Sequence, residues 1–289
     1  AYKSAYMAIK MSSASVPLTH EIEVVDELGR KKLIHIPAER PLTIYLDKRE
    51  LITLMTIGAN PEALVLGYLR NQRLVTSPDL IESIQVDWET ESVAVKTRRK
   101  DPDLMSKIGR KIITTGCGQG TVFSSVLDEI ETIRLPSEAR VQQSAIHQVI
   151  EEIRSSPSIY KKSGSVHCCA IFRNLGSSVE LLYHVEDVGR HNAVDAIAGL
   201  MWLDGLKGED LIFYTTGRLT SEMVIKGAQM GIPFLLSRSG TTRMALDVAA
   251  KVDMTLLGRC SGHHYLIYSS PYRIEYLESE KSDWAHHEK

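Results

Sequence analysis

The chain has 289 residues, enough for one large or two medium-sized domains. Apolar residues make up 43% and charged residues 24%, and a formal net charge of -2 without a dense Lys/Arg cluster argues against duplex DNA or RNA as a partner. The first residues contain no continuous apolar segment typical of a secretory signal, and no run of apolar residues is long enough to cross a membrane. We therefore expect a cytoplasmic protein.

After an N-terminal tail, residues 1–19, short β-rich runs dominate residues 20–135. We expect strands at "EIEVV", "KLIHI", "LTIYL" and "LITLMTI", which are separated by "ELGRK" and by prolines. Pro61 followed by spaced leucines predicts a helix from Pro61 to about Arg73. Two further strands, "IESIQVDW" and "SVAVKTR", precede the glycine-rich segment "TTGCGQG". This region is predicted to be a mainly β subdomain.

The second half, residues 136–272, alternates strand and helix patterns. Ser137 is a good N-cap, and the apolar spacing after it predicts a helix that begins there. Strands are expected at "VHCCAIF", "SVELLYHV", "DLIFYT", "PFLLS" and "MTLLG", and helices at "NAVDAIAGLMWL", "SEMVIKGAQMG" and "TTRMALDVAAKV". The alternation predicts an α/β layered sheet that is partly parallel, with "YLIYSS" as an edge strand and 273–289 as a polar tail.

Four of the predicted strands lead into turns that contain glycine and arginine. The carboxyl ends of parallel strands share one edge of a sheet, where ligands bind, and arginine is a forked donor to phosphate oxygens. The turns therefore predict an anionic, phosphate-bearing ligand, although each arginine could equally be an ordinary surface residue paired with an acid. No standard nucleotide-binding fingerprint occurs. The arginines are Arg190, Arg218, Arg238, Arg243 and Arg259.

The segment "HVEDVGRHN" is the densest polar cluster at these turns. Glu186, Asp187 and His191 could form a functional site or a structural salt-bridge knot, and the sequence leaves both open. "HVE" also matches half of the zinc-deaminase signature, but the P-C-x-x-C half is missing, so we expect no tightly bound metal. The adjacent His263 and His264 are more typical of loop donors than of a metal-ligand pair.

The four cysteines have no regular spacing, which argues against a disulfide framework. Cys168 and Cys169 lie in a strand pattern and are expected to be buried and inert. Cys117 stands between glycines, just past a strand-like run, where backbone N–H groups would favour its thiolate. We expect a nucleophile there, with a loop cysteine of no consequence as the alternative.

Six blocks of the sequence together closely resemble the FdhD family, the formate dehydrogenase accessory sulfurtransferases. The blocks are "TTGCGQGT", "VHCCAIF", "EDVGRHNAVD", "TTGRLTSEMVIKGAQMGIP", "SRSGTTRMALDVA" and "TLLGRCSGHHYLIY", and the similarity runs from about Pro41 to Tyr268. The resemblance implies a cytoplasmic, homodimeric sulfur carrier whose α/β part has the cytidine deaminase fold without its zinc. Such proteins accept sulfur from a cysteine desulfurase as a persulfide. They pass it to molybdenum bis(molybdopterin guanine dinucleotide), or its tungsten equivalent, before that cofactor enters formate dehydrogenase.

The resemblance assigns the persulfide to Cys117 and cofactor binding to one stretch of the chain. That stretch is Arg259, Cys260, Ser261, Gly262, His263 and His264. To these the strand-end turns add Arg190, His191, Gly217, Arg218 and Ser239.

The chain departs from the family at Gly120, where many members have a second cysteine that could release the sulfur by internal attack. Cys168, Cys169 or Cys260 could resolve the persulfide instead, or the acceptor could take the sulfur directly. The competing interpretation is a cofactor-binding chaperone without sulfur chemistry, which the turn arginines would suit equally well. A zinc enzyme is a third class, which we do not expect.

Overall fold

The computed structural model describes residues 9–99, 115–116, 118–119, 130 and 132–276. These residues form two compact units. The first takes its residues from Ala1–Leu127, Ser158–Cys168 and Val185–Leu206, and the second from Asp128–Pro157, Cys169–His184 and Lys207–Lys289. The division is not the single cut near Pro136 that the sequence suggested, because two later segments join the N-terminal unit.

A five-stranded sheet forms the centre of the first unit, in the order β1-β6-β7-β4-β5. Alternate residues of β4 are fully buried, so Leu42, Ile44 and Leu46 face the core. The strands predicted in this region are all present, and the sheet also contains the unpredicted strand β1 (Lys10–Met11). The bounds of the others are β4 (Arg40–Leu46), β5 (Arg49–Thr56), β6 (Ile81–Asp87) and β7 (Ser92–Thr97), with the turn η1 (Pro78–Leu80) before β6.

The N-terminal tail is shorter than predicted. Lys10 and Met11 pair in parallel with Ser83 and Ile84 of β6, and the Ser12 hydroxyl donates to Glu62 over 2.7 Å. Residues 10–12, Lys-Met-Ser, show no strand pattern in the sequence, because an edge strand pairs on one side only and needs little burial.

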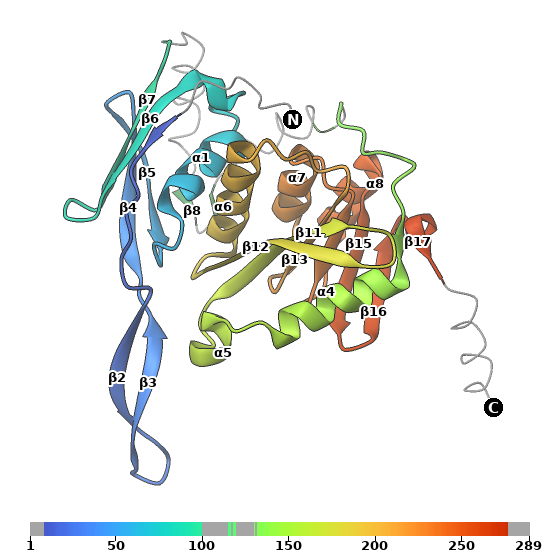
Figure 1. The fold of residues 1–289 in the computed structure, drawn as a ribbon, viewed down its shortest axis with the longest axis horizontal. Coiled ribbons are helices and arrows are strands. Elements are labelled where there is room, and N and C mark those ends of the chain that lie inside the picture. Colours follow the sequence, from blue (N-terminus) through green and yellow to red (C-terminus); the bar gives the residue numbers. More distant parts are fainter. Residues whose placement is uncertain (1–8, 100–114, 117, 120–129, 131, 277–289) are drawn as a thin grey trace. The chain divides into compact units, whose positions relative to one another are not determined.

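The predicted strands "EIEVV" and "KLIHI" form a separate two-stranded hairpin, β2 (Thr19–Val25) and β3 (Lys31–Pro37) (Figure 1). Its turn is built on Asp26, which accepts hydrogen bonds from the N–H groups of Leu28 and Arg30. The Lys32 ammonium and these donors lower the pKa of Asp26 to about 2. The hairpin exposes Leu33 on β3 at 65%, so its register depends on the turn and on cross-strand ion pairs more than on a core.

Helices α1 (Pro61–Asn71) and α6 (Arg190–Leu203) cross within the first unit. A Cβ on Gly67 would collide with the carbonyl of Asp195, and one on Gly199 with the carbonyl of Ala63, so both positions need glycine for the close approach. This crossing is the physical reason that residues 185–206 belong to the N-terminal unit. The helix predicted from Pro61 is confirmed.

The second unit is built on a six-stranded sheet in the order β12-β11-β13-β14-β15-β16. Strands β13, β14 and β15 are mutually parallel, and β16 closes the edge in the antiparallel direction, as predicted for "YLIYSS". The bounds are β11 (His167–Asn174), β12 (Val179–Asp187), β13 (Leu211–Thr215), β14 (Phe234–Ser237), β15 (Thr255–Ser261) and β16 (His264–Ser269). The mixed α/β fold class is therefore confirmed.

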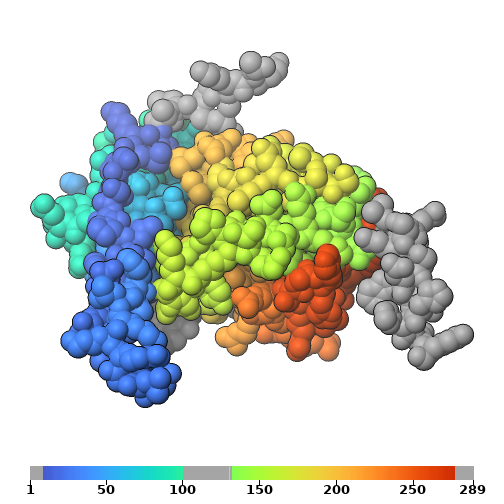
Figure 2. Space-filling model, turned by 60° about the horizontal axis from the view of Figure 1, so that its bottom comes forward, coloured from blue at the N-terminus to red at the C-terminus, as the bar shows by residue number. Residues whose placement is uncertain are grey.

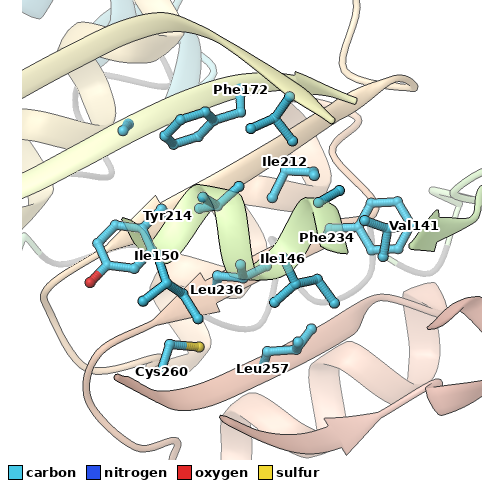
Figure 3. Close-up of a cluster of buried hydrophobic side chains, with 14 of the residues drawn as sticks. Val141, Ile146, Ile150, Phe172, Ile212, Tyr214, Phe234, Leu236, Leu257 and Cys260 are labelled. Atoms are coloured by element: carbon cyan, nitrogen blue, oxygen red, sulfur yellow. The ribbon is translucent and has the colours of Figure 1, made fainter. Parts of the chain in front are cut away.

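Helix α4 (Gln143–Ser155) runs across one face of this sheet (Figure 1). Ile146 and Ile150 of the helix pack on Phe172, Tyr214 and other apolar side chains of the strands, as Figure 3 shows. Helix α7 (Ser221–Gln229) approaches β14 through Gly227, where an added Cβ would press on Leu235, and α8 (Arg243–Val252) packs beside α7. The sheet thus separates α4 from α7.

Helix α4 begins six residues later than predicted, at Gln143 instead of Ser137. The residues before it form a turn, with the Ala139 N–H bonded to the Pro136 carbonyl, and then the two-residue strand β10 (Val141–Gln142). Val141 fits a helical spacing, but it is buried as a strand residue because β10 pairs with β17 (Ile274–Glu275) from the far end of the chain. The local pattern contains no sign of that distant partner.

The polar tail also begins later than residue 273. Arg273 is the last residue of the turn η2 (Pro271–Arg273), is fully buried and donates to the carbonyls of Asp253 and Pro136. The short helix α5 (Ile159–Ser163) has no counterpart in the predicted pattern. Among the described residues, no helix is both long and apolar enough to cross a bilayer.

Candidate functional site

The turn after β13 is fixed by the buried last residue of that strand, Thr215. Its Oγ1 accepts a hydrogen bond from the Gly217 N–H over 3.0 Å, and the Cys169 thiol donates to the same oxygen over 3.4 Å. The side chain of Thr215 is fully buried, so its hydroxyl shapes the backbone and does not meet solvent. The backbone of Gly217, a predicted site residue, is therefore fixed by a buried hydroxyl of the preceding strand.

The turn after β14 is tied to the same place by Ser237, which is also the last residue of its strand and fully buried. Its hydroxyl donates to the Gly217 carbonyl over 2.6 Å and accepts from the Ser239 N–H over 2.9 Å. The Ser239 hydroxyl then donates to the Thr216 carbonyl over 3.0 Å. Two neighbouring turns are thus one hydrogen-bonded framework.

The irregular end of β15 joins this framework through its backbone. The Arg259 N–H donates to the Ser239 carbonyl over 2.9 Å, next to Gly258, where an added Cβ would lie 2.9 Å from the same oxygen. Arg259 has φ +55°, a left-handed conformation that is uncommon for a residue other than glycine. Backbone strain of this kind persists only where the surroundings hold it, and it concentrates at ligand sites.

The two turns and the end of β15 place the side chains of Arg218, Arg238 and Arg259 at the surface, while the hydroxyls of Thr215 and Ser237 at the ends of β13 and β14 are buried. The sequence pattern included Arg243 in this set. In the structure its Nε lies 3.0 Å from Oδ1 of Asp247, one helical turn along α8, and forms an ion pair with it. The framework therefore presents three exposed guanidinium groups from adjacent strand ends. Such an arrangement can bind an anion with several phosphate oxygens.

The predicted stretch from Arg259 to His264 divides into a buried part and an exposed part. Cys260 is 2% exposed and lies among the core side chains near Ile150 and Leu236 (Figure 3). Burial raises the pKa of its thiol to about 12, so it remains protonated and is a poor nucleophile. Ser261, Gly262, His263 and His264 form the exposed turn between β15 and β16. The cysteine therefore anchors the turn from the core side.

The turn of "EDVGRHN" belongs to the first unit, and its acids are used inside the fold. Asp187 accepts from the Thr56 hydroxyl, from the Gly189 N–H over 3.2 Å and from the Asn192 amide over 3.2 Å. Burial raises the pKa of Asp187 in spite of these bonds. Glu186 accepts from the N–H groups of Ile159 and Tyr160 at the start of α5. Of the two readings, the hydrogen bonds support the structural one for both acids.

Arg190 and His191 occupy the first turn of α6 in the first unit, and both are half-buried. Burial and the Arg190 charge together lower the pKa of His167 at the start of β11. Cys117 lies outside the described residues, between Thr115–Gly116 and Gly118–Gln119, which pair as β8 and β9. No group of three or more metal-ligating side chains occurs in the described parts of the chain.

Sequence reasoning missed Thr215, Ser237 and His147. The first two had a usable signal, since each is a hydroxyl residue that ends a buried strand immediately before a glycine- or arginine-containing turn. His147, on α4, had none, because its contact is with His263, far along the chain, at 4.7 Å between ring centroids.

Comparisons with known proteins agree with this architecture. Residues 37–275 match the profile of the FdhD/NarQ family. The chain is 29% identical over 241 residues to a sulfur carrier protein FdhD of Listeria innocua, covering 83% of this chain and 91% of the relative. It is 30% identical over 244 residues to one of Sulfurisphaera tokodaii, with the same coverage. A crystal structure described as a formate dehydrogenase accessory protein from Desulfotalea psychrophila superposes with a TM-score of 0.70 at 26% identity, covering 90% of this chain and all of that one.

Proposed function

Because the chain belongs to the FdhD/NarQ family, we propose that it is a sulfur carrier that serves the maturation of formate dehydrogenase. Cys117 carries the sulfur as a persulfide, and the turns after β13, β14 and β15 bind the guanine dinucleotide part of the molybdenum or tungsten cofactor, which is the acceptor. The observation that carries the binding half is the set of exposed guanidinium groups of Arg218, Arg238 and Arg259 on one hydrogen-bonded framework.

The loading step is a redox-neutral exchange. The Cys117 thiolate attacks the outer sulfur of the desulfurase persulfide, the S–S bond of the donor breaks, and the donor cysteine leaves as a thiolate. Cys168, Cys169 and Cys260 are each at most 3% exposed. Their buried thiols therefore do not reach a persulfide on another residue unless the fold opens. We infer that the acceptor takes the sulfur from Cys117 directly: the S–S bond of the persulfide breaks, Cys117 leaves as a thiolate, and the acceptor supplies the two electrons that bring the outer sulfur to the sulfide level. Direct release also agrees with glycine at position 120.

Mass spectrometry after incubation with a cysteine desulfurase and cysteine tests the loading step. We expect the mass of one added sulfur atom on the peptide that contains Cys117, and its loss after treatment with a reducing agent. Cys117→Ala should remove the adduct, whereas Cys260→Ala should keep it. An adduct that persists in the Cys117→Ala protein would show that another residue is the carrier.

A cofactor-binding chaperone without sulfur chemistry is the second candidate, favoured by the missing cysteine at Gly120. Formate dehydrogenase activity in cells that carry Cys117→Ala separates the two functions. If the protein is a chaperone, the substitution should leave that activity unchanged. If it is a sulfur carrier, the substitution should abolish the activity. In both cases purified protein should bind GDP at low salt, and the absence of GDP binding would contradict the cofactor site.

A further inference from the structure

The turn Ser261–His264 is exposed at all four of its residues. The ladder between β15 and β16 shifts register between Gly258 and Ser261, and Gly262 at the tip has φ +58°. Within the paired strands, Ser261 and His264 face each other as the last partners. An exposed two-residue tip of this kind is easily displaced, because few backbone bonds close it.

One side chain from another element docks on this tip. His147 of α4 lies with its imidazole edge-on to that of His263, with 4.7 Å between centroids and 85° between ring planes. Tyr265, two residues after His263, has its ring centroid 5.9 Å from that of His147 and packs on the core cluster under α4. In Figure 2 the α4 segment, in green, and the β15–β16 segment, in red, lie side by side at the surface.

The supporting helix is rigid where His147 projects from it. Ile146 and Ile150, on either side, are buried against the sheet. Glu151, one turn further along, has a pKa lowered first by its hydrogen bond to Arg154 and, to a lesser degree, by the His263 charge. The tip of the turn is therefore placed against a fixed ring and near a carboxylate.

We propose that His147 is a positioning residue of the cofactor site: its ring holds the turn Ser261–His264 so that Arg259 and the exposed histidines keep the arrangement that receives the ligand. The strained backbone of Arg259 lies at the other end of the same irregular stretch, so release of the tip would let that strain relax. The inference rests on the proposed function for binding, and it is independent of sulfur transfer by Cys117.

Two measurements on the full-length protein test the role of His147. Backbone amide exchange of Ser261–His264, referenced to β14, should become several-fold faster in His147→Ala. The affinity for GDP, used as the probe, should fall about two- to tenfold, the amount that loss of one aromatic pair accounts for. His147→Phe keeps a ring on α4 and should restore both values to within about twofold of the parent. Ser155→Ala, an exposed change on the same helix whose hydroxyl bonds only to the Glu152 carbonyl, is the matched control and should alter neither.

The outcomes separate the two proposals. Unchanged exchange in His147→Ala would show that the ring does not order the turn, and faster exchange with unchanged GDP affinity would show that the ordering has no part in binding; either result overturns the positioning role. Failure of the proposed cofactor site has a different signature, since the parent and His147→Phe proteins would also fail to bind GDP, and this inference would fall with it.

Discussion

The turn after β12 and the turns after β13, β14 and β15 have similar sequences, rich in glycine, arginine and hydroxyl or acidic residues, but the fold uses them differently. In the first turn, the acids are buried and accept bonds from Thr56, Asn192 and two helix starts. At the ends of β13 and β14 buried hydroxyls hold the backbone, at β15 a backbone N–H does so, and the arginines at all three places remain at the surface. The acids of the first motif are committed to the fold, whereas the arginines of the other strand ends stay exposed.

The difference shows that composition at a strand end does not decide the role of a polar side chain. The Asp187 carboxylate already accepts hydrogen bonds from groups of the first unit, so little acceptor capacity remains for a substrate. Arg218 and Arg259 are exposed charged groups above a framework that is already complete without their side chains.

The largest effect is expected for Asp187→Ala. The change leaves the Thr56 hydroxyl, the Gly189 N–H and the Asn192 amide without their acceptor, and we expect the free energy of unfolding to fall by about 3 kcal/mol. Urea unfolding measures the loss. Asp204→Ala, an exposed acid at the end of α6, should cost less than about 0.5 kcal/mol. Equal losses in both variants would remove the claim that Asp187 is structural.

The next effect concerns the arginines. Arg218→Ala or Arg238→Ala should weaken GDP binding about 10- to 100-fold, because each removes charge-assisted hydrogen bonds to phosphate. Arg218→Ala should leave the free energy of unfolding within about 0.5 kcal/mol of the parent. Calorimetric titration at low salt measures the affinity.

Arg243→Ala is the matched control for these variants, since that arginine is exposed at the same end of the sheet but is paired with Asp247. It should change GDP affinity less than about twofold. A loss as large as that of Arg218→Ala would mean that GDP responds to general positive charge and not to a defined site.

A smaller effect, whose direction follows from the raised pKa of Asp187, is expected in the pH dependence of stability. Burial raises the pKa of Asp187, so the folded state favours the neutral carboxyl, and ionisation opposes folding above the folded-state pKa. That cost is relieved as pH falls through the folded-state pKa. The stability of the parent relative to Asp187→Asn should therefore rise between neutral pH and about pH 4.5. A fall over that range would show that hydrogen bonds to the carboxylate outweigh its burial.

The smallest effect is expected at Cys260. With a pKa of about 12, its thiol is ionised in only about one molecule in ten thousand at about pH 8, so iodoacetamide should leave it unmodified in the folded protein and label it in urea. Peptide mapping measures the labelling. Cys260→Ala should keep GDP affinity within about twofold of the parent. Rapid labelling of the folded protein would show that the turn after β15 opens away from the core.

The elements themselves were largely predictable from the sequence, and the errors have local causes. Period-2 and helical spacings indicated every strand of the main sheets except the short edge strand β1, because burial on one face leaves a repeating trace in the residues. The start of α4 was placed too early because Val141 fits a helical pattern but is buried by pairing with Ile274. The unit that contains α6 was assigned wrongly for a similar reason, since its partner α1 lies far away in the chain.

The order of strands and helices and the arginines at the strand ends could be predicted from the amino-acid pattern, because those properties depend on near neighbours. Which polar groups are committed to the fold became visible in three dimensions alone. Thr56 and Asp187 are 131 positions apart, and the His147 ring meets a turn on a different element. Whether a side chain is satisfied or available depends on what the fold brings to it from a distance, and no local pattern carries that information.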